Sequence, residues 1–219
     1  MSLGFILLIA SGVLILFGAG QRVLDRMRLT DREAILFIAL IIAGGFLPDI
    51  WLSRSFAFNV GGALVPLGLC MYLWFKADTF LEKARSIAAA LLTGVAVYVL
   101  GRVLPADPAE MVVDPTLVYG AAGGLIAYVF GRSRRGAFIA GTLGVMLANL
   151  AAWGYANAQG ADQALVLGGA GGFDVIVLSG LIAVLLSELV GELVERAKRG
   201  RQKPTREFVN GDFVRREQR

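Results

Sequence analysis

Seven long apolar runs constrain this 219-residue sequence more than any other feature. A bilayer core of about 30 Å is crossed by about 20 helical residues, and runs of about 17 still suffice. The runs are continuous instead of alternating, which excludes a β-barrel and favours helices, because helices satisfy every backbone group in lipid. We therefore predict an all-α fold, a polytopic membrane protein with about seven transmembrane helices. The predicted spans are Leu3–Gly20, Ala34–Leu52, Ala57–Phe75, Ile87–Leu104, Thr116–Phe130, Ala137–Tyr155 and Ala164–Leu189.

The basic residues fix the predicted orientation. Only 17% of the residues are charged, whereas a soluble domain carries about a quarter. With seven spans, every one of the 21 Lys and Arg residues except Arg54 and Arg102 falls on the same face. The opposite face carries the acidic loop Ala106–Asp114. Since basic loops stay in the cytoplasm, we predict an N-terminus outside, a cytoplasmic C-terminus and a location in the cell (inner or plasma) membrane.

Two regions are expected along the chain. Residues 1–195 form the predicted seven-helix transmembrane domain, with the lipid bilayer as its partner. The first span lacks a basic N-terminal flank and a clear cleavage site, so it is interpreted as an anchor and not as a signal peptide. Residues 196–219 are basic and polar, and we expect a disordered cytoplasmic tail. This orientation explains the net charge of +4 without a nucleic-acid partner.

The sequence excludes several chemistries by what it lacks. It contains no His and only one Cys, Cys70. Disulfides within the chain, Ser–His nucleophiles and the usual zinc, haem and thiol-redox ligand sets are therefore ruled out. It also lacks the glycine–lysine signature of phosphate-binding loops. We predict no cofactor and no metal site, and whether the protein is an enzyme stays open.

Four polar residues inside the predicted spans form the candidate site. An Asp at a helix centre costs about 3 kcal/mol on insertion scales, so such residues usually face a partner or water. Asp174 lies about nine residues into the seventh span, roughly 14 Å below its outer end at about 1.5 Å per residue. Asp49 lies three residues from the outer end of the second span, Asn149 lies about 9 Å deep in the sixth, and Asn59 opens the third. All four are expected to converge in the outer half of the bilayer.

Glycines surround the deeper aspartate. Residues 168–174 read Gly-Gly-Ala-Gly-Gly-Phe-Asp, and Gly costs up to about 1 kcal/mol per position in a helix. One interpretation is close helix packing through small-xxx-small pairs, which would also allow a homo-oligomer. The other is a broken helix whose carbonyl groups line a cavity, with Gly171 and Gly172 among the binding residues. Packing is favoured for most pairs, and a broken helix is favoured at Gly168–Gly172. The pairs are Gly120/Gly124, Ala140/Gly144, Ala148/Ala152 and Gly168/Gly172.

Two of these segments carry a family resemblance. Asn59–Pro66 reads Asn-Val-Gly-Gly-Ala-Leu-Val-Pro, and Gly168–Gly180 reads Gly-Gly-Ala-Gly-Gly-Phe-Asp-Val-Ile-Val-Leu-Ser-Gly. Together they resemble a family of prokaryotic membrane proteins catalogued as domain of unknown function 1614. The similarity covers spans two to seven. It implies no activity, because none is attached to that family.

A second, more generic similarity is to presenilin-type intramembrane aspartyl proteases. In that family, one aspartate on each of two helices shares a proton with the other, and one of them lies in a Gly-x-Gly-Asp motif. Gly171 and Asp174 match this motif, whereas Phe173 replaces its second glycine. Asp49 follows Pro48 instead of the typical tyrosine, and both aspartates lie nearer the outside than in the proteases. The resemblance implies catalytic roles for Asp49 and Asp174 only if the protein is a protease.

Three functions remain open from the sequence. Transport is the leading hypothesis: Asp49 and Asp174 would bind a proton or small cation, aided by Asn59, Asn149 and loosened glycine backbone. An aspartyl protease would instead bring the two carboxylates within about 3 Å of one another. A structural or assembly protein would use them only to hold helices together.

Overall fold

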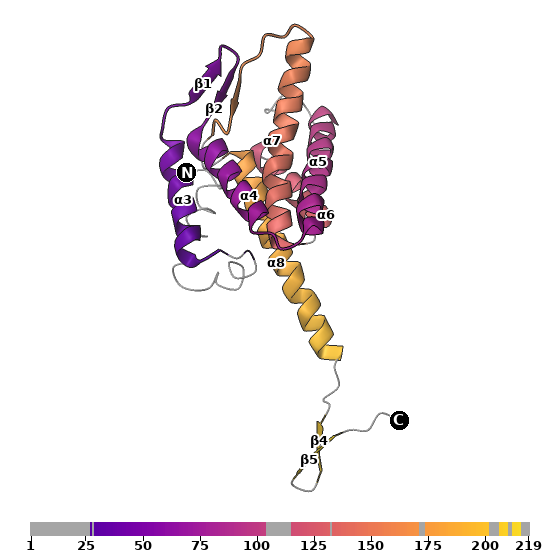
Figure 1. The fold of residues 1–219 in the computed structure, drawn as a ribbon. Helices are drawn as coiled ribbons and strands as arrows, with labels where there is room; N and C mark the ends of the chain where they lie inside the picture. Colours follow the sequence, from indigo (N-terminus) through magenta and orange to yellow (C-terminus); the bar gives the residue numbers. More distant parts are fainter. Residues whose placement is uncertain are drawn as a thin grey trace. The chain divides into compact units, whose positions relative to one another are not determined.

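The computed structural model describes residues 27, 29–103, 115–131, 133–170, 174–201, 206–209 and 212–215. Within them it contains six α-helices, one π-helix and two small sheets (Figure 1). The predicted first span and the acidic loop lie outside the described residues. The elements are α3 (Asp31–Gly45), β1 (Ile50–Ser53), β2 (Phe56–Phe58), the π-helix η1 (Val60–Leu64), α4 (Val65–Phe75), α5 (Phe80–Val103), α6 (Pro115–Gly131), α7 (Arg134–Ala158), β3 (Leu165–Leu167), α8 (Val175–Arg201), β4 (Arg206–Val209) and β5 (Asp212–Arg215).

The chain divides into two compact units, residues 1–187 and 188–219. The second unit holds the end of α8 and the antiparallel hairpin of β4 and β5, in which Arg206 pairs with Arg215. A disordered tail was expected from residue 196. In the structure α8 continues to Arg201 and two short strands follow it, and the disorder of the tail stays a prediction.

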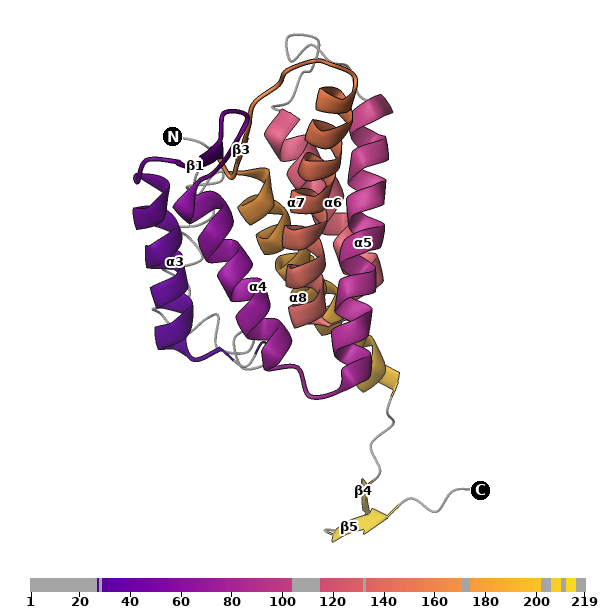
Figure 2. The same cartoon turned by 45° about the horizontal axis from the view of Figure 1, so that its top comes forward.

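Helix α7 packs against α4, α5 and α6, and small residues let it do so closely (Figure 2). A Cβ added at Gly144 would lie 2.7 Å from the Cβ of Thr93 on α5. A Cβ added at Gly124 of α6 would lie 2.5 Å from Cγ2 of Ile182 on α8. The packing interpretation is therefore confirmed at Gly124 and Gly144. These faces are occupied within the chain, and the homo-oligomer stays a prediction.

A three-stranded sheet caps one end of the bundle, which we call the sheet end (Figure 1). Strand β1 runs antiparallel to β2, with Ile50 opposite Phe58, and β2 runs parallel to β3, with Phe56 opposite Leu165. The prediction of continuous helices over Ala34–Leu52, Ala57–Phe75 and Ala164–Leu189 is thus wrong at this end, and the fold is not purely α.

Local chemistry explains where α3 begins and why it ends before the sheet. The Thr30 side chain caps α3 at its start, where Glu33 completes a capping box. At its other end, α3 finishes with Gly44 and Gly45, and Pro48 lies three residues further on. Proline lacks a backbone N–H and disfavours helix in the residue before it. The next residues are rich in aromatic and branched side chains, which favour strands. Apolar strands and apolar helices look alike in a hydropathy pattern.

Helices α5 and α7 are long and apolar enough to cross a membrane, judged by length and composition. Three shorter apolar helical stretches accompany them, Val60–Phe75, Val118–Gly131 and Val175–Gly191. These helices favour association with a membrane, and the seven-span arrangement stays a prediction.

Ion pairs join several elements at the opposite end of the bundle. The carboxylate of Glu33 accepts a hydrogen bond from the Tyr72 hydroxyl and lies 3.2 Å from Lys76 Nζ. Arg135, at the start of α7, lies 3.3 Å from Glu82 of α5 and donates to the Lys76 carbonyl at 2.8 Å. This charged end therefore ties α3, α4, α5 and α7 together.

We expect the charged end to make stability fall in acid. The hydrogen bond from Tyr72, then the backbone N–H of Thr30 and the charge of Lys76, lower the pKa of Glu33 from 4.5 to about 2. A carboxyl group with a lowered pKa contributes stability above its unfolded value, and this contribution is lost as the pH falls towards the folded value. The thermal unfolding midpoint of the purified protein should therefore drop between about pH 4.5 and about pH 2.

Glu33→Gln should lower the midpoint at neutral pH and remove much of this acid-dependent drop. Tyr72→Phe, which removes only the largest cause of the pKa shift, should keep part of it. If wild type and Glu33→Gln lost stability in parallel over the whole pH range, Glu33 would not be the group that titrates.

Candidate functional site

Asn59 connects three segments of the chain at the sheet end. It is 3% exposed, and its side-chain oxygen accepts a hydrogen bond from Gly62 N–H at 2.9 Å, which caps η1. Its Nδ2 donates to Asp49 Oδ1 at 2.9 Å, and its own N–H donates to the Leu167 carbonyl of β3 at 2.9 Å. A buried amide with all these partners holds the turn after α3, the start of η1 and β3 in one arrangement.

Asp174 is a helix cap. Its Oδ1 accepts a hydrogen bond from Ile176 N–H at 3.0 Å, and its Oδ2 accepts one from Ala170 N–H at 3.4 Å. Its backbone carbonyl accepts from Leu178 N–H at 3.0 Å, the first bond of the helix. The prediction that Asp174 lies about nine residues inside a helix is wrong, because α8 begins only at Val175.

The two candidate aspartates have different hydrogen-bond partners among the described residues. Asp49 is bonded to Asn59, and Asp174 is bonded to backbone amides. A proton-sharing dyad requires direct contact between the two carboxyl groups, and the protease alternative stays a prediction. Gly171 and Gly172 lie outside the described residues.

Exchanging the amide and the carboxylate tests the Asn59 connection. Asn59→Asp alone should cost about 1–3 kcal/mol of unfolding free energy, because it removes a donor and places two carboxylates together. Adding Asp49→Asn should recover most of this loss, since the amide at position 49 can donate to Asp at position 59, which still caps Gly62. Denaturant unfolding of wild type, Asn59→Asp, Asp49→Asn and the double variant measures the coupling. Losses that simply add would show that the two side chains act independently.

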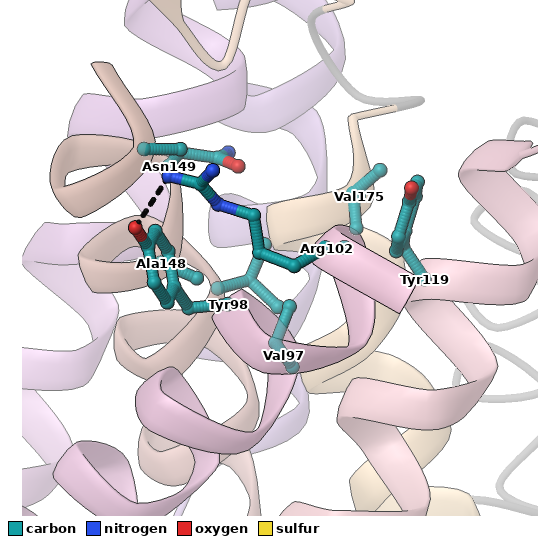
Figure 3. Close-up of a pocket in the computed structure, with 10 residues that line it drawn as sticks. Val97, Tyr98, Arg102, Tyr119, Ala148, Asn149 and Val175 are labelled. Atoms are coloured by element: carbon teal, nitrogen blue, oxygen red, sulfur yellow. Dashed lines mark hydrogen bonds between the residues drawn. The ribbon is translucent and has the colours of Figure 1, made fainter. Parts of the chain in front are cut away.

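The fourth candidate, Asn149, lies in a cleft at the sheet end that is formed by α5, α6, α7 and the start of α8 (Figure 3). The cleft has a volume of about 290 Å³, at the lower limit of the roughly 300–1,000 Å³ that is usual for ligand sites. We call it the Arg102 cleft. Its polar and larger apolar lining residues are Val97, Tyr98, Arg102, Tyr119, Val145, Asn149 and Val175.

Two tyrosines hold the guanidinium of Arg102 in this cleft. Its Nη2 donates a hydrogen bond to the Tyr98 hydroxyl at 2.8 Å, drawn as a dashed line in Figure 3. The guanidinium carbon also lies 4.2 Å from the ring centroid of Tyr155 and 5.2 Å from that of Tyr98. Such cation–π contacts fix the plane of the group without neutralising its charge. No carboxylate among the described residues pairs with Arg102.

Sequence reasoning identified Asn149 but missed Arg102 and the three tyrosines near it. Arg102 is one of two basic residues that the charge count left on the minority face, and Tyr98 precedes it by one helical turn. That combination was the available signal. Tyr119 and Tyr155 come from other helices, and only the tertiary structure brings them near.

A mostly helical chain with apolar helices, a sheet-stabilised end and one polar cleft defines the general class as a helical-bundle protein with features of membrane proteins. The chain belongs to a family described as a protein of unknown function, DUF1614, whose model matches residues 22–186. This match confirms the resemblance to that family, but it supports neither a prokaryotic origin nor a similarity to the aspartyl proteases. Among curated proteins and among solved structures, no match is found.

Proposed function

We propose that this chain is a seven-span membrane protein, with its N-terminus outside and its basic tail in the cytoplasm. In this arrangement the sheet end faces outwards and the charged end faces the cytoplasm. The support is the lopsided distribution of Lys and Arg together with the location of large apolar side chains in the structure.

The surface of α5 argues for lipid contact. One side of this helix presents Val95 at 64% exposed, Val99 at 53% and Val103 at 77%, whereas its buried side holds Ser86, Ala90 and Thr93. Large exposed apolar residues also occur on α3, α4, α6 and α8. Soluble monomers rarely expose contiguous apolar surface on this scale, and bundles in lipid pack through small and hydroxyl residues.

The proposed activity is the binding of a small solute in the Arg102 cleft from the outer side, as part of transport or permeation. The observation that supports this activity is that the cleft combines phenol, amide and apolar walls with a guanidinium that pairs with no carboxylate in the described part of the chain. Asp49 and Asp174 belong in this proposal to the scaffold of the sheet end, since both have structural partners. This proposal assigns the solute to the Arg102 cleft, which is lined from α5, α6, α7 and the start of α8, and not to the two aspartates.

Filling the cleft tests this function. Equilibrium dialysis of the purified protein would measure binding of benzoate, choline and glycerol, which represent anionic, cationic and neutral solutes. Ala152, an exposed lining residue of the cleft, is changed to Trp, and Val95→Trp adds the same ring on the outward face of α5 as a control.

Wild type and Val95→Trp should bind at least one solute, and Ala152→Trp should lose at least about tenfold in affinity for it. All three proteins should keep similar unfolding midpoints. Absence of binding to wild type, or binding unchanged by Ala152→Trp, would refute a solute site in this cleft.

A further inference from the structure

We infer that the solute of the Arg102 cleft is a small organic anion with an apolar body. This inference rests on the proposed function and specifies the ligand of that same site. The first argument is the state of Arg102 itself. Its charge faces rings and a phenol, with no carboxylate partner among the described residues, so it is available to a ligand.

The geometry of the guanidinium leaves its donors usable. Stacking on Tyr155 occupies a face of the group, and Tyr98 takes a bond from one N–H group. An arginine carries five N–H donors in a planar fork that matches the two oxygens of a carboxylate or phosphate. An anion can therefore be bound edge-on while the rings keep the fork in place.

The rest of the lining selects against cations and highly polar solutes. Among the residues that the structure describes, no Asp or Glu lines the cleft to offset the repulsion between Arg102 and a cation. Val97, Val145 and Val175 form apolar wall, and Tyr119 and Asn149 add neutral hydrogen-bonding groups. A ligand with one anionic end and a short apolar part can bind Arg102 through the first and the valine wall through the second.

The anionic group could come from a soluble acid or from the headgroup of an anionic lipid. Benzoate binding by equilibrium dialysis represents the first source. Phosphatidylglycerol represents the second source. The protein is exchanged into nanodiscs that contain phosphatidylglycerol and phosphatidylcholine, and the phosphatidylglycerol that co-purifies with it is measured. Each is measured on wild type, Arg102→Gln, Arg102→Lys and Arg54→Gln, the last being a matched control at an exposed arginine outside the cleft.

Arg102→Gln should weaken binding of the anion at least about tenfold, and Arg102→Lys should restore it only in part, since an ammonium keeps the charge but not the fork. Arg54→Gln should match wild type. Loss confined to the benzoate arm would support a soluble acid, and loss confined to the lipid arm would support a headgroup. Full recovery of anion binding in Arg102→Lys would mean that Arg102 acts only as a positive charge at the membrane interface, and it would overturn the inference.

Choline binding at the cleft, sensitive to Ala152→Trp, would also overturn the inference while leaving the solute-binding function intact. Absence of any solute binding would instead remove the proposed function itself. Anion binding that is equal in wild type and Arg102→Gln would show that the anion sits elsewhere.

Discussion

Gly61→Ala is expected to destabilise the protein severely, by about 3 kcal/mol or more, because the new methyl group has no space that side-chain motion can provide. A Cβ at Gly61 would lie 2.2 Å from Gly45 N and 2.2 Å from the Ile41 carbonyl oxygen. Both are backbone atoms at the end of α3. The end of α3 and η1 would therefore have to separate.

Gly68→Ala is the matched control for this substitution. Gly68 lies in α4, and no described atom lies within 4 Å of a Cβ added there. Alanine should be neutral or stabilising at that position by up to about 1 kcal/mol, because it favours helix more than glycine does. Denaturant unfolding of the two variants measures the difference. Equal stabilities would show that α3 and η1 are not in close contact.

Gly168→Ala should also be strongly destabilising, for two separate reasons. Gly168 has a φ of +74°, in the left-handed region that costs other residues about 1–2 kcal/mol. Its Cβ would in addition lie 2.3 Å from the Gly62 carbonyl carbon, at the capped start of η1. Overpacking of this kind adds about 1–3 kcal/mol.

Gly160→Ala separates the two causes. Gly160 has a φ of +80° and no described atom within 4 Å of an added Cβ, so it tests conformational strain alone. The loss in unfolding free energy at Gly168 should exceed that at Gly160 by the overpacking part, about 1–3 kcal/mol. Equal losses would mean that β3 does not press against η1.

The middle of the bundle could be predicted from the sequence because apolar composition alone determines it. The spans expected at Ile87–Leu104 and Ala137–Tyr155 correspond to α5 and α7. The sheet end could not be predicted in this way. Pairing between Phe56 and Leu165 joins residues far apart in the chain, and hydropathy does not distinguish an apolar strand from an apolar helix.

The candidate site was predicted in part, for a related reason. Polar residues in apolar runs stand out, which is why Asp49, Asn59 and Asn149 were selected. Their partners depend on tertiary contacts, and these contacts give Asn59 a capping role that depth in a span does not reveal. A charged residue near the end of a run, such as Arg102, looks like an ordinary flank until the rings around it are seen.

Labelling of single cysteines from outside the cell tests the central claim, a membrane-inserted bundle whose cleft opens outwards. The native Cys70 is 1% exposed, so it should stay unmodified in the folded protein. Ala152→Cys places a thiol in the cleft, and Ala84→Cys places one on an exposed position near the start of α5, at the charged end. A membrane-impermeant maleimide should label the first in intact cells and the second only after permeabilisation. Labelling of Ala84→Cys but not Ala152→Cys in intact cells, or recovery of the protein in the soluble fraction, would contradict the account.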